Sequence, residues 1–86
     1  MKIRITRTGG FAGRTLGREV DTAKVRGGRQ IEKLAERARR RPASPARTPD
    51  AFAYEIVIDG TTYVTGGDDP AWGALIERLF ATPGLQ

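Results

Sequence analysis

The residues that could do chemistry in this chain are carboxylates, arginines and lysines, because its 86 residues include no Cys and no His. The chain therefore has no thiol nucleophile, imidazole base or disulfide, and no structural zinc site of the usual ligand types. A catalyst would have to rely on carboxylates, Lys, Tyr or Arg alone. We expect a protein that is not an enzyme, with no catalytic residues, no cofactor and no metal of its own.

Asp68 and Asp69 form the most obvious pair of candidate ligands. Adjacent carboxylates rarely converge on one ion without further ligands, and no EF-hand spacing surrounds them. Gly66 and Gly67 before them could cradle a phosphate, but the two carboxylates would repel it, and no phosphate-binding motif is present. Because Pro70 follows directly, the pair is better explained as the cap of a helix.

Basic residues are concentrated in the first part of the chain. Residues 1–49 carry 14 basic and four acidic residues, a net charge of +10, whereas residues 50–86 have a net charge of −5. One group could bind phosphates, with Phe11 or Tyr63 as stacking residues: Lys33, Arg37, Arg39, Arg40, Arg41 and Arg47. A solvated face at the C-terminal end of a helix, which tolerates positive charge, is the simpler explanation of this group. The alternatives are a nucleic-acid-binding module and an interaction module for another acidic protein.

The elements that must position these residues begin with an antiparallel hairpin. Residues 1–8 alternate, with Ile3 and Ile5 on one face, and residues 15–21 alternate again. The segment between them is Gly9, Gly10, Phe11, Ala12 and Gly13. Its three glycines allow unusual backbone dihedrals around one large apolar side chain, which an ordinary hairpin turn does not require.

A helix and a loop follow this hairpin. Gly27 and Gly28 are unfavourable inside a helix, so we expect the helix to begin near Arg29, with an apolar stripe from Ile31 to Ala38. Residues 41–50 contain three prolines and no large apolar side chain. They predict a mobile Pro/Arg-rich loop.

A second hairpin and a second helix complete the fold. The Asp59-Gly60 pair predicts a two-residue turn that sets Ile56 opposite Tyr63. From Pro70 the apolar residues recur with helical spacing. The predicted order is ββαββα, an α+β fold with a four-stranded antiparallel sheet and two helices packed on one face.

The apolar side chains suffice for the core of one small domain over residues 1–86. The expected core is Ile3, Ile5, Leu16, Val20, Ile31, Leu34, Phe52, Tyr54, Ile56, Ile58, Tyr63, Trp72, Leu75, Ile76, Leu79 and Phe80. On the opposite sheet face, Val57 and Val64 could belong to an interaction surface. No apolar run is long enough for a membrane span, and the charged N-terminal strand lacks the apolar region of a signal peptide, so we expect a cytoplasmic protein.

Four segments carry a family resemblance. They are Ile-Arg-Ile-Thr-Arg-Thr-Gly-Gly-Phe-Ala-Gly (3–13), Glu-Val-Asp (19–21), Phe-Ala-Tyr-Glu-Ile (52–56) and the terminal amphipathic helix. Together they resemble the emfourin family of protealysin inhibitors. The resemblance does not extend to residues 25–50, where the family has a more acidic helix.

The resemblance implies an intracellular, proteinaceous inhibitor of thermolysin-like, or protealysin-like, zinc metalloproteases that blocks the active-site cleft. The zinc would belong to the partner. Carried over onto the matching motif, the partner-binding residues would be Gly9, Gly10, Phe11, Ala12 and Gly13. Phe11 would either anchor the turn beneath the sheet or project toward the partner.

Overall fold

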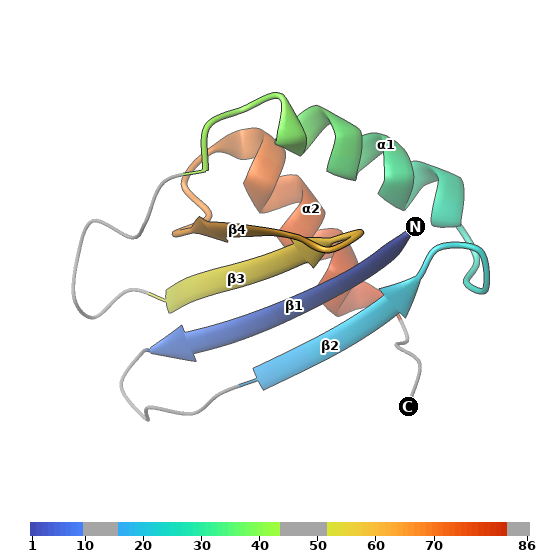
Figure 1. The fold of residues 1–86 in the computed structure, drawn as a ribbon, viewed down its shortest axis with the longest axis horizontal. Helices are drawn as coiled ribbons and strands as arrows, with labels where there is room; N and C mark the ends of the chain where they lie inside the picture. The colour runs from blue at the N-terminus through green and yellow to red at the C-terminus, as the bar shows by residue number, and fades with distance from the viewer. Residues whose placement is uncertain (10–15, 44–51, 83–86) are drawn as a thin grey trace.

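The computed structural model describes residues 1–9, 16–43 and 52–82. The predicted ββαββα order and the α+β class are confirmed (Figure 1). The elements are β1 (Lys2–Gly9), β2 (Leu16–Asp21), α1 (Gly28–Arg39), β3 (Phe52–Ile58), β4 (Thr61–Thr65) and α2 (Pro70–Ala81). Neither helix of the described part is long and apolar enough to cross a membrane.

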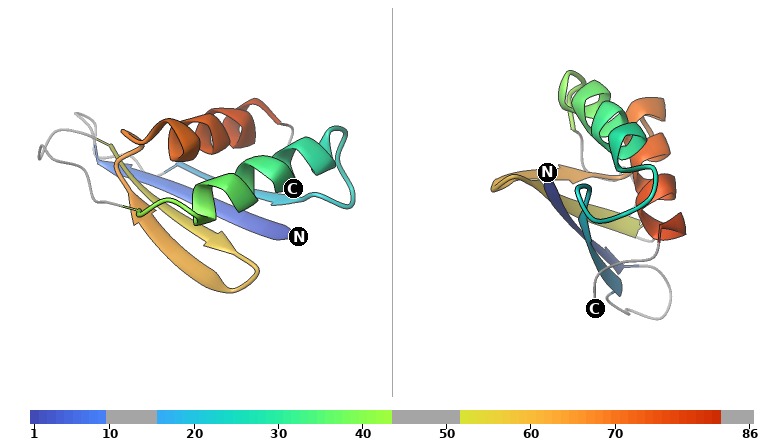
Figure 2. Two further views of the ribbon diagram at one scale, coloured as in Figure 1. Left: turned by 90° about the horizontal axis from the view of Figure 1, so that it is seen from above. Right: turned by 90° about the vertical axis from the view of Figure 1, so that its right-hand side faces the viewer.

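The four strands form one antiparallel sheet in the order β2-β1-β3-β4, so that β1 and β3 are central and β2 and β4 are the edges. Both helices lie on the same face of this sheet, as Figure 2 shows from two sides. Neither helix of the described segments lies on the opposite face. Since directly paired residues point to the same side of a sheet, the register determines which side chains meet the helices.

The core lies between the sheet and the helices. Ile3 pairs with Val20 and Ile58, Ile5 pairs with Ile56, and all five side chains are buried. From the helices, the buried apolar residues are Ile31, Ala35, Ala38, Ala71, Trp72, Leu75, Ile76 and Leu79. Further residues of the expected core pack against it while only partly buried: Leu34, Tyr54, Tyr63 and Phe80. Phe52 was also expected in the core, but its side chain is not among those that the structure describes.

Leu16 was expected in the core, and that expectation is wrong. Its side chain is 43% exposed. Leu16 is the first residue of the edge strand β2 and pairs only with Arg7 of β1, so it has a neighbouring strand on one side alone. Alternation correctly assigned Leu16 to the helix-facing side, but burial also requires cover, and the described segments leave this corner of the sheet partly open.

The second hairpin has the predicted register, with Ile56 opposite Tyr63 and Ile58 opposite Thr61. Its turn residues Asp59 and Gly60 both have positive φ angles, 47° and 88°, as a type I′ turn requires. Asp59 is also tied to β1, because its Oδ1 accepts a hydrogen bond of 2.9 Å from the Lys2 backbone N–H.

The two helices run antiparallel to each other. At one end, Trp72 Nε1 of α2 donates to the Arg41 carbonyl just after α1, and at the other Arg78 of α2 donates to Gln30 of α1. Helix α1 begins at Gly28, one residue before the predicted start, after Gly27 in the left-handed region at φ 72°. In the turn before this helix, the Asp21 side chain accepts a hydrogen bond from the Ala23 backbone N–H.

Candidate functional site

The predicted partner-binding motif begins at Gly9, the last residue of β1. Gly9 is exposed, has a φ of 93° and pairs with Phe52 of β3. A positive φ of this size favours glycine, so the backbone departs from strand geometry where the motif begins. Gly10, Phe11, Ala12 and Gly13 lie outside the described residues.

A cluster of arginine, aromatic and aliphatic side chains lies at this end of the sheet, on the helix-facing side. Arg7 pairs with Leu16 on one side and Tyr54 on the other, which places all three in one row across β2, β1 and β3. Phe80 of α2 lies over the row, with its ring centroid 5.6 Å from Arg7 Cζ and 6.4 Å from the Tyr54 ring. We call Arg7, Leu16, Tyr54 and Phe80 the Arg7 cluster.

The Arg7 cluster is partly open to solvent. Leu16 is exposed, and the other three members are half-buried. Such a guanidinium–ring contact is attractive because the ring face carries negative charge. Arginine and aromatic residues are enriched at protein–protein interfaces, whose energy is concentrated in a few such anchors. The cluster therefore has the composition of a protein-binding surface, and it borders the residue where the predicted motif begins.

A second arginine on the same side of the sheet has a structural role. Arg18, on β2 opposite Ile5, donates a hydrogen bond of 2.6 Å from NH1 to the Thr82 carbonyl. Thr82 is the C-cap residue of α2, and its hydroxyl donates to the Arg78 carbonyl. A cation at this helix end satisfies a free carbonyl and complements the helix dipole. Arg18 thus fixes the end of α2 that carries Phe80 into the Arg7 cluster.

The expected capping role of the Asp68-Asp69 pair is confirmed for Asp69. Its Oδ1 accepts from the Ala71 backbone N–H at 2.9 Å, and its Oδ2 accepts from Arg41 Nε at 3.0 Å. Asp68 is exposed. Across residues 1–9, 16–43 and 52–82, no group of three or more acidic residues is placed to hold a metal ion.

Asp69 makes stability depend on acidity. Burial alone raises the pKa of this carboxyl, but the Ala71 N–H, the hydrogen bond from Arg41 and the charge of Arg41 outweigh it and hold the pKa below the usual 3.8. The folded state binds the proton of Asp69 less tightly than the unfolded chain does. The ionised carboxylate therefore contributes fully to the free energy of unfolding above pH 3.8, and this contribution is lost as the pH falls through the folded pKa.

We expect the Asp69→Asn variant to lose less thermal stability than the wild type between pH 5 and pH 2. Asn caps a helix about as well as Asp but does not titrate, so the difference between the two chains isolates this carboxyl. Thermal unfolding followed by circular dichroism across this pH range measures it. Parallel pH profiles for the two chains would contradict the assignment.

The predicted phosphate-binding group does not act as one unit. Arg39 Nε donates to the Tyr63 hydroxyl at 3.2 Å, and Arg41 pairs with Asp69. The Tyr63 ring packs on Trp72 with a centroid distance of 5.0 Å, so Tyr63 is engaged within the fold. Lys33, Arg37 and Arg40 point to solvent on α1 and its C-cap position, whereas Arg47 lies outside the described residues.

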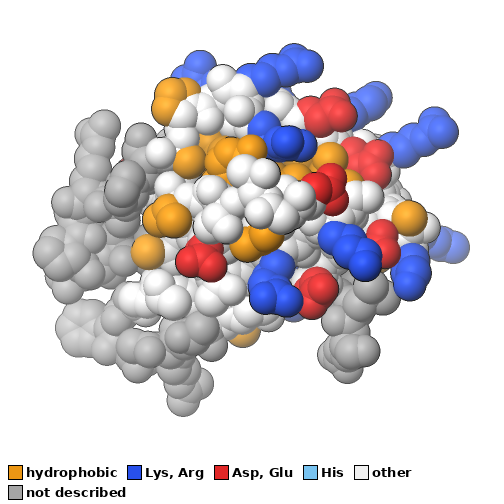
Figure 3. Space-filling model, viewed as in Figure 1, with side chains coloured by type: hydrophobic (Ala, Val, Ile, Leu, Met, Phe, Trp, Pro, Cys, Tyr) orange, Lys and Arg blue, Asp and Glu red, His pale blue; other side chains and the backbone are white. Residues whose placement is uncertain are grey.

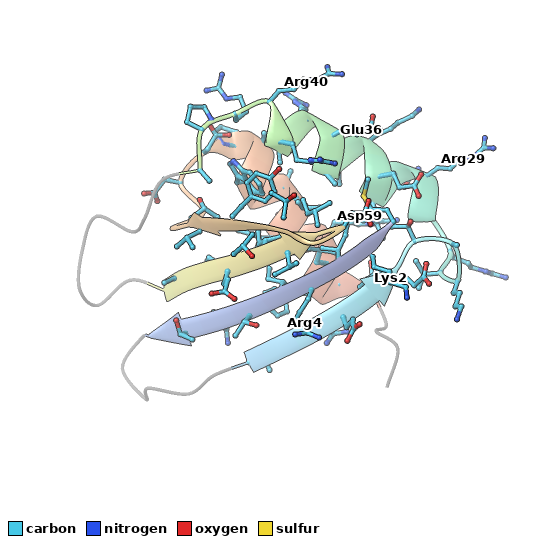
Figure 4. The ribbon with its side chains drawn as sticks, viewed as in Figure 1. Lys2, Arg4, Arg29, Glu36, Arg40 and Asp59 are labelled. Atoms are coloured by element: carbon cyan, nitrogen blue, oxygen red, sulfur yellow. The ribbon has the colours of Figure 1, made fainter. Side chains whose placement is uncertain are left out.

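The helix-free face of the sheet, which includes Val57 and Val64, is the other predicted surface. Val64 is 45% exposed, while Val57 is half-buried. Two of its charged side chains face each other, with Arg4 NH2 4.0 Å from Glu19 Oε2. Figure 4 shows Arg4 and Lys2 on β1, well separated from the outer side of α1. This face therefore carries partly compensated charge around a small apolar area.

Sequence reasoning missed the Arg7 cluster. Arg7 falls on the same alternating face as Ile3 and Ile5, and a charged residue in an apolar row was the available signal. The sequence does not show that Phe80 is the neighbour of Arg7, because this contact depends on where α2 crosses the sheet. The cluster is therefore a finding of the three-dimensional structure.

The fold and the site define a class: a small α+β protein with one antiparallel sheet, a partly open arginine–aromatic surface at one end and no metal cluster in the described residues. The family model named Emfourin matches residues 5–81, and the chain belongs to this family. The matched range includes residues 25–50, for which the sequence alone showed no resemblance. Searches of curated proteins and of solved structures found no match. Family membership suggests a role as a protease inhibitor.

Proposed function

We propose that this protein inhibits a thermolysin-like, protealysin-like zinc metalloprotease in the cytoplasm by binding across its active-site cleft. The observation that carries the proposal is membership of the emfourin family over most of the chain. The partner would supply the zinc. This chain would act by steric exclusion of substrate, which requires neither a catalytic group nor a metal of its own.

The proposed contact surface is the end of the sheet where β1 finishes. It comprises the motif Gly9, Gly10, Phe11, Ala12 and Gly13 together with the exposed part of the Arg7 cluster. Two features support this choice. The cluster has the side-chain types that dominate binding energy at interfaces, and it is held by a sheet whose central strands are paired on both sides. Rigid surfaces lose less conformational entropy on binding, which favours tight inhibition.

Titration of the chain against a purified thermolysin-like protease with a quenched fluorescent peptide tests the proposal. We expect activity to fall with added protein until a one-to-one complex has formed. Excess Zn²⁺ should not restore activity, whereas it should restore a protease inactivated by a chelator. Full activity at micromolar concentrations of the chain would contradict the proposal, and recovery with Zn²⁺ would show metal removal instead of cleft binding.

A further inference from the structure

Four cations form a continuous line on the outer side of α1. Arg29, Lys33 and Arg37 follow one another at intervals of four residues, and Arg40 lies three residues further on. With 3.6 residues per turn, these intervals place the four side chains on one stripe. The buried residues Ile31, Ala35 and Ala38 lie on the opposite side of the helix. We call Arg29, Lys33, Arg37 and Arg40 the cationic ridge.

The cationic ridge is fully presented to solvent. All four residues are exposed, and no carboxylate of the described segments forms an ion pair with any of them. Figure 3 shows Lys and Arg side chains standing along the margin over α1, and Figure 4 shows Arg29 and Arg40 projecting away from the sheet. At a rise of 1.5 Å per residue the ridge is about 16 Å long.

The neighbouring basic residues differ from the four cations of the ridge in having partners within the fold. Arg39 and Arg41 flank the ridge, but their guanidinium groups bond to Tyr63 and Asp69 within the fold. Glu36 is the one acidic residue along the ridge, and it also points to solvent (Figure 4). The ridge therefore holds an excess of positive charge that the described part of the fold does not neutralise.

We propose that the cationic ridge binds the phosphate backbone of duplex nucleic acid without reading its sequence. Interfaces between proteins have apolar and aromatic residues at their centres, and this ridge offers none. Binding to a phosphate backbone needs only regularly spaced cations, and about 16 Å corresponds to roughly five base-pair steps.

The same surface disfavours single strands. Single-stranded nucleic acid is held by bases stacked on aromatic side chains beside a basic groove. Tyr63, which is bonded to Arg39 beside the ridge, has its ring packed on Trp72 and its hydroxyl engaged by Arg39. Helix α1 thus offers cations but no aromatic side chain beside the ridge, which favours the duplex. This inference is independent of the proposed protease inhibition, because the ridge lies on the outer side of α1 and the Arg7 cluster lies against the sheet.

Fluorescence anisotropy with a labelled 20-base-pair DNA duplex between 50 and 200 mM NaCl tests the proposal. Four neutralised phosphates predict a slope of log K against log salt of about −3.6, a loss of roughly 100-fold over this range. Single variants Arg29→Gln, Arg37→Gln and Arg40→Gln should each reduce the slope by about one. Circular dichroism establishes that each variant is folded.

Two further variants distinguish binding by the ridge from an effect of the protein's net charge. Arg4→Gln removes one exposed positive charge from the opposite sheet face and should leave the slope unchanged. Glu36→Gln removes the negative charge along the ridge and should tighten binding. Equal losses for Arg4→Gln and Arg40→Gln would overturn the proposal. So would tighter binding of a single strand of equal phosphate number, or equally tight, ridge-dependent binding of polyglutamate, which would indicate an acidic polypeptide as the partner.

Discussion

Replacing Leu16 with arginine is expected to weaken inhibition of the target protease while leaving the fold intact. Leu16 is 43% exposed at the start of an edge strand, so its replacement creates no cavity, and the free energy of unfolding should change by less than about 0.5 kcal/mol. In the proposed complex this side chain lies beside Arg7, and a second guanidinium there would be desolvated without a partner. An interface anchor is worth about 2 kcal/mol, or roughly 30-fold in the inhibition constant.

Val64→Arg is the matched control for this substitution. Val64 is 45% exposed and also lies on an edge strand, but on the helix-free face of the sheet. The same added charge at this position should leave the inhibition constant within about threefold of the wild type. Tyr54 and Phe80 are less suitable targets, because both pack against the core and their loss would lower stability as well. Equal effects of the two arginine variants would exclude the Arg7 cluster as the contact surface.

Local patterns predicted most of the fold because they depend on few neighbours. The Asp59-Gly60 turn determines the register of its own hairpin, and Asp69-Pro70 marks the start of α2 through interactions within one turn. The alternation of Ile3 and Ile5 likewise places one face of β1 in the core. Each of these patterns depends only on residues within one short segment, so it can be recognised in a single sequence.

The candidate site was harder to predict because it depends on tertiary placement. Leu16 follows the apolar alternation, yet its exposure is decided by the sheet order and by where α2 ends. Similarly, the contact between Arg7 and Phe80 joins the first strand to the last helix. The division of the basic run into bonded and solvent-facing arginines depends on the rotation of α1 against β4, which brings Arg39 to Tyr63.

The Gly28→Ala substitution is expected to cause the largest loss of stability. A Cβ on Gly28 would lie 1.8 Å from the Thr22 backbone oxygen and 2.8 Å from its carbonyl carbon. Thr22 cannot easily move aside, because its N–H donates to the Met1 carbonyl and its hydroxyl proton is shared between the Met1 carbonyl and the Glu32 carboxylate. We expect a destabilisation of about 3 kcal/mol or more, seen as a fall of more than about 10 °C in the midpoint of thermal unfolding.

Gly17→Ala provides the comparison that isolates this backbone contact. A Cβ on Gly17 would meet only the Ile5 carbonyl oxygen at 3.8 Å, an ordinary contact, so this variant should unfold within a few degrees of the wild type. Both substitutions reduce the entropy of the unfolded chain in the same way, and the difference between them therefore reports the close approach of α1 to Thr22. If the two variants were equally stable, the junction between β2 and α1 would be able to relax. Glu32 would then not hold Thr22 rigidly, and α1 would dock through its apolar stripe alone.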